Sequence, residues 1–249
     1  MTKLFLGMVA IVLMLSIIQI VPEAIAQTKV ENFSGKEVID ARDGEVYQTV
    51  MIGNKRWFAE NLRYDVPTVY TTDSRVDTIL SEDGLKHYGR LYDWATVMNL
   101  SSSYNNESLN ANGQSQGICP KGWHVSTDEE WKELERFMGM EEGNIEAVSL
   151  ERPLGNMQQL ISSEDWINSD YQSREGLFNV FPTGKYVLKE KRGLPPGFRN
   201  LGERATFWTS TENDAYSVWG RSIAYDRSIV SRYNKYPKEM GYSCRCVED

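Results

Sequence analysis

The sequence predicts an α+β domain in which two or three helices lie beside β-hairpins and long loops. Two observations carry this prediction. A strongly capped helix begins after Thr127, and short strands separated by turns occupy residues 46–59 and much of the chain beyond residue 178. Helical periodicity and strand alternation in separate stretches are typical of the α+β class.

The stretch 117–139 specifies a turn, a short strand and a helix in succession. Thr127 and Glu130 have the spacing of a capping box, in which each side chain satisfies a free backbone amide at the helix start. An apolar stripe at i, i+3 and i+7 follows, formed by Trp131, Leu134 and Met138. Local sequence therefore predicts the start and the buried face of this helix.

A β-hairpin is predicted near the start of the domain. Val46, Val50 and Ile52 fall on one side of an alternating strand. Gly53-Asn54 then supplies a tight turn, and residues 56–59 return as the partner strand. Asn61 follows the hairpin, and we expect it to be a buried polar residue that ties loops together.

The other expected elements are less strongly marked. Apolar residues at helical spacing predict further helices at residues 91–98 and near 157–161. Strands are expected in the last part of the chain, at residues 205–209, 218–225, 229–233 and 241–247, with a turn at 226–228.

The first residues are predicted to be a secretory signal peptide. An apolar run extends from Leu4 to Val21, and Ala24-Ile25-Ala26 has the small-x-small pattern of a cleavage site. An uncleaved membrane anchor is the alternative, because the run is close to the ~18 residues that begin to suggest a span. We expect a signal peptide at 1–26, a linker or loose arm at 27–39 and one domain at 40–249. The protein is then exported, with no membrane insertion after the signal is removed.

The acidic composition bears on the partners of the protein. The formal net charge is −8 at pH 7, which disfavours nucleic acid and anionic membranes. Ordinary solubility of an exported protein explains the same charge, so it favours no particular partner.

Few residues are suited to catalysis. His87 and His124 are the only two histidines, and His124 lies in a predicted strand, where we expect a structural role. The sequence contains no Gly-x-Ser-x-Gly elbow, phosphate-binding glycine loop or dinucleotide fingerprint. We expect no catalytic residue, no metal and no cofactor.

The candidates for ligand contact lie near the C-terminal strands. Trp208 and Tyr216 are aromatic residues of the type that stack on sugar rings or partner proteins, although most strand tryptophans are core residues. Glu212-Asn213-Asp214 offers the oxygen ligands that calcium requires, but one acidic tripeptide is more often a solvated turn. We expect ligand contacts from Trp208, Glu212, Asn213 and Tyr216, and we expect calcium to be dispensable.

Several blocks along the chain resemble the Fibrobacter succinogenes major paralogous domain, a family of bacterial secreted and surface proteins. The run CPKGWHVSTDEEW, from Cys119 to Trp131, is similar to the family's hallmark. The other similar blocks, in the family's order, are residues 43–62, 88–98, 178–184, 207–212 and 241–249. A more distant resemblance links the same helix start to the C-type-lectin-like fold, which includes the formylglycine-generating enzymes.

These resemblances imply a fold and two possible functions. The distant one implies a C-type-lectin-like mixed fold. The family resemblance, with the aromatic loops and the missing catalytic signatures, implies an exported, non-enzymatic module that binds a carbohydrate or another cell-surface component, such as a protein. The alternative is a cysteine- and copper-dependent oxidase related to formylglycine-generating enzymes, because two cysteines flank Arg245.

The family resemblance also predicts a disulfide. Export places the three cysteines where disulfides persist. Cys244 and Cys246 point to the same side of a strand, so either could reach Cys119. The family's terminal Arg-Cys-Val motif matches residues 245–247, so we expect a Cys119–Cys246 bond. Cys244 is then the odd thiol, either buried or exposed and able to link two chains.

Overall fold

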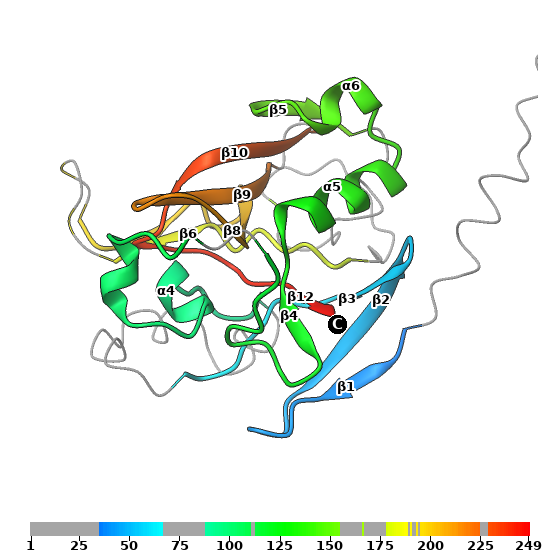
Figure 1. The fold of residues 1–249 in the computed structure, drawn as a ribbon, viewed down its shortest axis with the longest axis horizontal. Coiled ribbons are helices and arrows are strands. Elements are labelled where there is room, and N and C mark those ends of the chain that lie inside the picture. The colour runs from blue at the N-terminus through cyan, green and yellow to red at the C-terminus, as the bar shows by residue number, and fades with distance from the viewer. Residues whose placement is uncertain are drawn as a thin grey trace, which may run out of the picture. The chain divides into compact units, whose positions relative to one another are not determined.

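Three antiparallel β-sheets contain most of the regular secondary structure of the described residues (Figure 1). The computed structural model describes residues 35–66, 88–110, 113–154, 166, 178–188, 190, 193, 195–224 and 229–249. The predicted α+β class is therefore wrong, because the described part of the domain is mainly β. No helix among these residues is long and apolar enough to cross a membrane.

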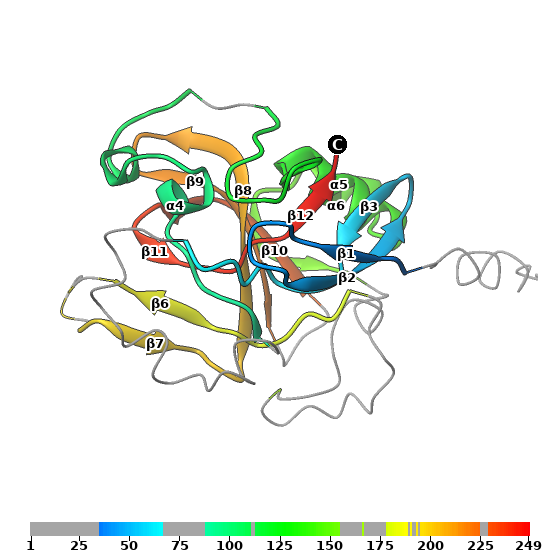
Figure 2. The ribbon, with the colours of Figure 1, turned by 90° about the horizontal axis from the view of Figure 1, so that it is seen from below.

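The five-stranded sheet begins with the predicted hairpin. Its strands, in spatial order, are β1 (Glu37–Ile39), β2 (Val46–Ile52), β3 (Lys55–Phe58), β12 (Cys246–Glu248) and β4 (Trp123–Val125). Strand β12 lies between β3 and β4, and Figure 2 shows it near β3. Its Val247 pairs with Trp57 of β3 and with His124 of β4. Residues 37–39 were expected in a loose arm, but they form the edge strand β1.

The other two sheets come from the second half of the chain. One contains β5 (Ser149–Pro153), β10 (Ile229–Pro237), β9 (Ser217–Ala224) and β8 (Arg204–Asp214), in that order. The other contains β11 (Met240–Gly241), β6 (Lys185–Val187) and β7 (Gly197–Arg199). The expected turn at 226–228 lies outside the described residues.

Most of the described helices are short. The described helices are α4 (Trp94–Val97), the 3₁₀ turn η2 (Ser102–Asn105), α5 (Asp128–Phe137) and α6 (Glu142–Ile145). The helix expected over residues 91–98 is reduced to α4, because Tyr92 instead exchanges backbone hydrogen bonds with Tyr242. The helix expected near 157–161 lies outside the described residues.

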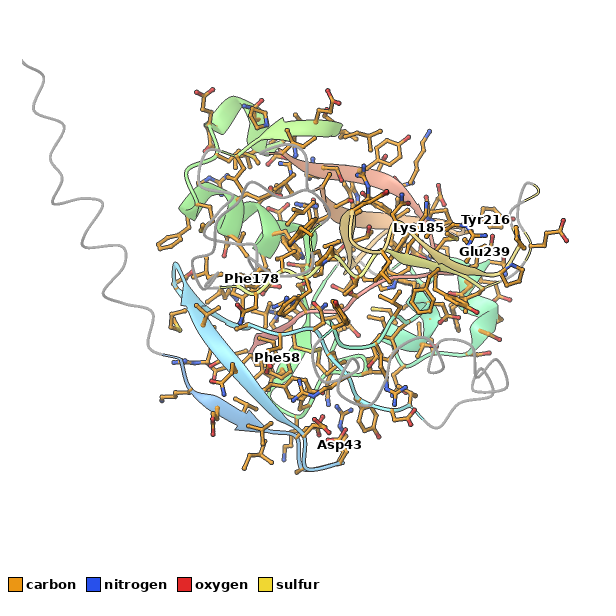
Figure 3. The ribbon with its side chains drawn as sticks, turned by 180° about the vertical axis from the view of Figure 1, so that it is seen from behind. Asp43, Phe58, Phe178, Lys185, Tyr216 and Glu239 are labelled. Atoms are coloured by element: carbon orange, nitrogen blue, oxygen red, sulfur yellow. A yellow bond between two sulfur atoms is a disulfide. The ribbon has the colours of Figure 1, made fainter. Side chains whose placement is uncertain are left out.

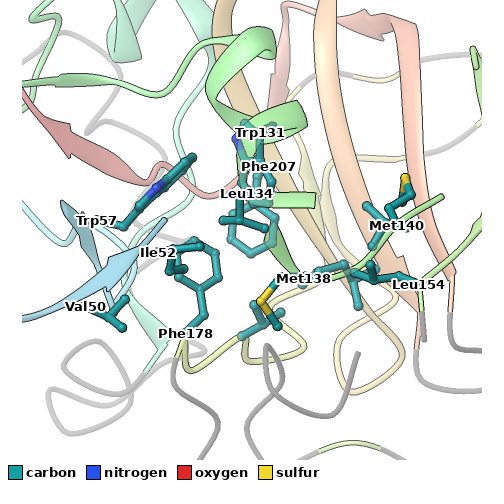
Figure 4. Packing of buried hydrophobic residues seen from close by; sticks show 14 of the residues in the cluster. Val50, Ile52, Trp57, Trp131, Leu134, Met138, Met140, Leu154, Phe178 and Phe207 are labelled. Carbon is teal, nitrogen blue, oxygen red and sulfur yellow. The ribbon is translucent and has the colours of Figure 1, made fainter. Parts of the chain in front are cut away.

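Helix α5 has the start that the sequence predicts. Thr127 Oγ1 accepts a hydrogen bond from Glu130 N at 3.1 Å, and Glu130 Oε2 accepts one from Thr127 N at 2.9 Å. The apolar stripe of Trp131, Leu134 and Met138 is buried. This stripe packs against the five-stranded sheet in a hydrophobic cluster that also contains Trp57 and Phe178 (Figure 4).

The five-stranded sheet is covered on both faces. Val50, Ile52 and Trp57 belong to the cluster under α5, whereas Tyr47 and Phe58 belong to a second cluster that also contains Trp208 and the three cysteines. Successive residues of a strand point to opposite faces, so the hairpin divides its side chains between two cores. Val46, expected to be buried with Val50 and Ile52, is 39% exposed.

A buried network of charges joins α5 to the four-stranded sheet. Glu135 Oε1 accepts hydrogen bonds from Arg152 Nη2 at 2.5 Å and from Arg221 Nε at 2.6 Å. Asp128 binds Arg221 and Arg232, with distances of 2.7 Å to each guanidinium. Burial opposes ionisation of Asp128, but the two guanidiniums outweigh it and lower the pKa of this carboxyl. Two carboxylates of one helix thus hold arginines from three strands.

We predict that Glu135→Gln strongly destabilises the domain. The substitution leaves Arg152 and Arg221 without the carboxylate that both share, and removing one partner of a buried ion pair typically costs about 3–5 kcal/mol. Urea unfolding followed by circular dichroism measures this free energy. Glu142→Gln is the matched control, because the Arg136–Glu142 pair is exposed and should contribute little. Equal midpoints for the two variants would contradict the prediction.

Candidate functional site

The most exposed aromatic side chain among the described hydrophobic residues lies at the tip of the β8–β9 hairpin. Tyr216 is 66% exposed. We call residues 213–217 the Tyr216 turn; Asn213 and Asp214 are also exposed. Figure 3 shows Tyr216 at the periphery of the domain, near Glu239 and far from the core residue Phe58. The turn therefore presents an aromatic ring, an amide and a carboxylate to solvent.

Hydrogen bonds fix the shape of this turn. Asp214 Oδ1 accepts from Tyr216 N at 2.8 Å, and Tyr216 O accepts from Lys238 N at 3.0 Å. Asn213 donates to Ser217 Oγ at 3.0 Å and accepts from Asn234 at 2.9 Å. Burial opposes ionisation of Asp214, but the hydrogen bonds around it, led by that of the Tyr216 amide, together outweigh it and lower its pKa. The exposed groups are thus held in place before any ligand binds.

The buried Glu212–Lys238 ion pair lies next to the Tyr216 turn. Glu212 Oε1 accepts from Lys238 Nζ at 2.5 Å and from Leu109 N at 3.0 Å, while Oε2 accepts from Ser108 Oγ at 2.9 Å. Lys238 Nζ also lies 4.5 Å from the centre of the Trp94 ring. Burial opposes ionisation of Glu212, but Lys238 and the other donors outweigh it and lower its pKa. Glu212 is therefore a support of the turn and does not face solvent.

Trp208 cannot contact a ligand, contrary to expectation. The residue is 0% exposed, its indole Nε1 donates to Tyr92 O at 2.7 Å, and its ring lies 4.5 Å from that of Tyr242. The sheet register shifts between Trp208 and Glu212, so strict alternation does not hold along this part of β8. The structure thus brings Asn213 and Tyr216 together at the surface and places Trp208 in the core.

The sequence does not predict that Asn234 and Lys238 lie beside the Tyr216 turn. Both come from β10 and its end, and they reach the Tyr216 turn because β10 pairs with β9 through Tyr236 opposite Val218. Predicting the β9–β10 hairpin in the correct register would have identified them. The expected strand ended at residue 233, which left both residues out.

We predict that calcium does not stabilise the domain. Both carboxylate oxygens of Glu212 are already occupied by Lys238, Leu109 and Ser108, so a cation at residues 212–214 would have to displace a buried ammonium group. A calcium site also needs about six to eight oxygen ligands. Thermal unfolding with and without EDTA checks this. A melting temperature that falls on chelation would overturn it.

His124 lies between two carboxylates at the start of α5. Its Nδ1 is 2.8 Å from Asp249 Oδ1, and its Nε2 is 2.8 Å from Glu130 Oε1. Gln114 Nε2 lies 3.3 Å from the same Nε2, and Lys55 Nζ lies 3.3 Å from Glu130 Oε1. Burial opposes charging of the imidazole, but Glu130 and Asp249 outweigh it and raise the pKa of His124. The ring is nearly fully buried, and each of its nitrogens lies within hydrogen-bond distance of a carboxylate.

This arrangement predicts that stability falls as pH rises above neutrality. A raised pKa in the folded state means that the charged imidazole stabilises the fold. That contribution is complete below the ordinary histidine pKa of about 6.5 and is lost as pH rises through the raised value. The melting temperature measured from pH 6 to 9 should therefore decline more for the wild type than for His124→Gln, which cannot be charged. Parallel curves would contradict this assignment.

The cysteine pairing agrees with the family resemblance. Cys119 and Cys246 form a disulfide across 127 positions of sequence, and Cys244 is a buried free thiol. The expected Cys119–Cys246 bond is confirmed, and of the two possibilities for Cys244 the structure shows the buried one. Asn61 is also buried, as expected, and it donates to Tyr88 O and accepts from Arg245 Nε at 2.7 Å.

Comparisons with known proteins give one match. The family model of the Fibrobacter succinogenes major domain matches residues 50–248. Searches of curated proteins and of solved structures found no match, so the C-type-lectin-like resemblance is not confirmed by any solved structure. The matched residues include the disulfide, helix α5 and the Tyr216 turn, and the chain belongs to the Fibrobacter succinogenes major domain family.

Proposed function

We propose that this domain is an exported, non-enzymatic binding module that recognises a carbohydrate at the Tyr216 turn. The observation that carries the proposal is an exposed tyrosine held between polar groups on a turn that is already ordered. Aromatic rings stack on the apolar faces of sugars, while amides and carboxylates hydrogen-bond hydroxyl groups. Binding of a ligand here would cost little conformational entropy, because the turn is already ordered.

Three features of the turn support this choice of ligand. Asn213 and Asp214 both lie shortly before Tyr216 in sequence and are exposed with it. The turn stands on a four-stranded sheet and on a buried ion pair, and binding groups on loops are commonly positioned by such a rigid scaffold. A cell-surface protein is the other possible partner, and the same exposed groups would contact it.

We predict that Tyr216→Ala abolishes most glycan binding without unfolding the domain. Loss of one stacked aromatic ring should weaken binding about tenfold, given roughly 1.5 kcal/mol for an aromatic contact. Glycan arrays and polysaccharide pull-downs with the exported chain first identify a ligand, and calorimetry then compares the variants. Tyr216→Phe, which keeps the ring, should retain most of the affinity.

Leu201→Ala is the control, because Leu201 is 39% exposed and lies away from the turn in sequence. Circular dichroism confirms folding of each variant. Trp208→Ala is unsuitable for this test, since removal of a fully buried tryptophan typically costs about 3–5 kcal/mol of stability. No binding to any glycan or cell-surface extract, or equal affinity for Tyr216→Ala, would count against the proposal.

The copper-dependent oxidase remains the second hypothesis, and it makes a different prediction. Cys246 is committed to the disulfide, and Cys244 is buried, so neither residue presents a thiol to a substrate in this state. An oxidase would consume oxygen in the presence of thiol peptides and copper(I). The binding module would not.

A further inference from the structure

The three cysteine sulfurs lie together in the second hydrophobic cluster. The Sγ atoms of Cys119, Cys244 and Cys246 are all within 4.8 Å of one another, and all three residues are 0% exposed. The bond joins Cys119 to Cys246, and Cys244 keeps its thiol. A thiol this close to a disulfide is placed for exchange, in which a thiolate attacks one sulfur and displaces the other.

The two cysteines that could pair with Cys119 are Cys244 and Cys246, which lie in one short segment. Cys246 opens β12, where it pairs with Val125, and Cys244 precedes it, with its carbonyl accepting from Leu62 N at 3.0 Å. Residues two apart in an extended chain point to the same side. The sulfur of Cys119 is therefore close to the sulfurs of both Cys244 and Cys246.

The buried cation of Arg245 lies between Cys244 and Cys246 in sequence. The guanidinium of Arg245 donates to Asn61 Oδ1 at 2.7 Å, Phe58 O at 3.0 Å and Asn179 O at 2.8 Å. In the described part of the chain, no carboxylate lies within ion-pair distance of it. Burial raises the pKa of Cys244 to about 12, while the charge of Arg245 acts in the opposite direction. This cation favours the thiolate form of Cys244.

We propose that these three cysteines form an internal exchange site, in which Cys244 can replace Cys246 as the disulfide partner of Cys119. The Cys244 thiol gives up its proton, and its thiolate attacks Sγ of Cys119. The Cys119–Cys244 bond forms as the Cys119–Cys246 bond breaks, and Cys246 leaves as a thiolate that takes up a proton. One disulfide and one thiol are present before and after the step, so no oxidant or reductant is needed.

The exchange would move the covalent anchor of the C-terminal segment. In the observed state the disulfide holds β12, the strand between β3 and β4. In the exchanged state it would hold the residue before Arg245, and β12 would keep only its hydrogen bonds and packing. Burial of Cys244 makes the step slow in the folded state, so alkaline pH or partial opening of the C-terminal segment should accelerate it.

Peptide mapping of the oxidised full chain tests the proposal. The protein is incubated at pH 7.0 and 8.5, with and without urea below the unfolding midpoint, then quenched with acid, alkylated and digested with trypsin. Trypsin cleaves after Arg245, so the two rival cysteines fall in different peptides. We expect the alkyl label to move from Cys244 to Cys246, with a rate that rises about tenfold per pH unit as the thiolate fraction rises. Arg245 and Tyr92 are the titratable groups coupled to Cys244. Burial keeps Tyr92 protonated in this range, whereas burial lowers the pKa of Arg245 to about 9, so partial loss of that charge near pH 8.5 works against the rise in rate.

Two variants make the outcome decisive. Cys246→Ser should form the Cys119–Cys244 disulfide on mild oxidation and keep a native circular dichroism spectrum. Cys244→Ser should keep the Cys119–Cys246 bond under every condition. The proposal fails if the wild type is labelled only at Cys244 after prolonged incubation, or if both thiols of Cys246→Ser stay free. It also fails if the exchange rate depends on protein concentration, since the step is then intermolecular.

Discussion

Two of the buried carboxylates of helix α5 tie the helix to the four-stranded sheet, and the position of the helix depends on them. Asp128 and Glu135 lie seven residues apart on one side of the helix and hold Arg152, Arg221 and Arg232 from three strands. Ion pairs have directional geometry that hydrophobic contacts lack. The network therefore fixes the rotation of α5 about its axis and its position relative to the four-stranded sheet. Trp131 and Leu134 are then directed into the cluster shared with the five-stranded sheet, and Thr127 and Glu130 are placed beside His124.

The parts of the fold that could be predicted from sequence are those that local interactions determine. The capping box of α5 and the hairpin β2–β3 depend on residues within a few positions of one another, and both formed as expected. The sheet order depends on pairings between distant segments, such as Val247 with Trp57, and these leave no local pattern. The fold class was wrong for a related reason. Apolar spacing over residues 91–98 predicts a helix of about two turns, but only Trp94–Val97 is helical, because Tyr92 pairs with the distant Tyr242.

The candidate site could be predicted only in part. The segment from Trp208 to Tyr216 contains both a buried aromatic residue and an exposed one, and alternation would assign them to the same side of a regular strand. The register shifts within β8 break that alternation, and they are invisible in the sequence. Glu212 is ambiguous for another reason, because a carboxylate near a turn is usually solvated, and its partner Lys238 becomes a neighbour only through the pairing of β9 with β10.

The place of β12 has a consequence for the order of folding. This strand is among the last residues of the sequence, yet it lies inside the five-stranded sheet, with β3 on one side and β4 on the other. Hairpin β2–β3 emerges early in synthesis, but an isolated two-stranded hairpin is marginally stable at best. Strands β3 and β4 can be joined in one sheet only after residues 246–248 have been made. Completion of this sheet therefore depends on a strand that is synthesised after every other described strand of the domain.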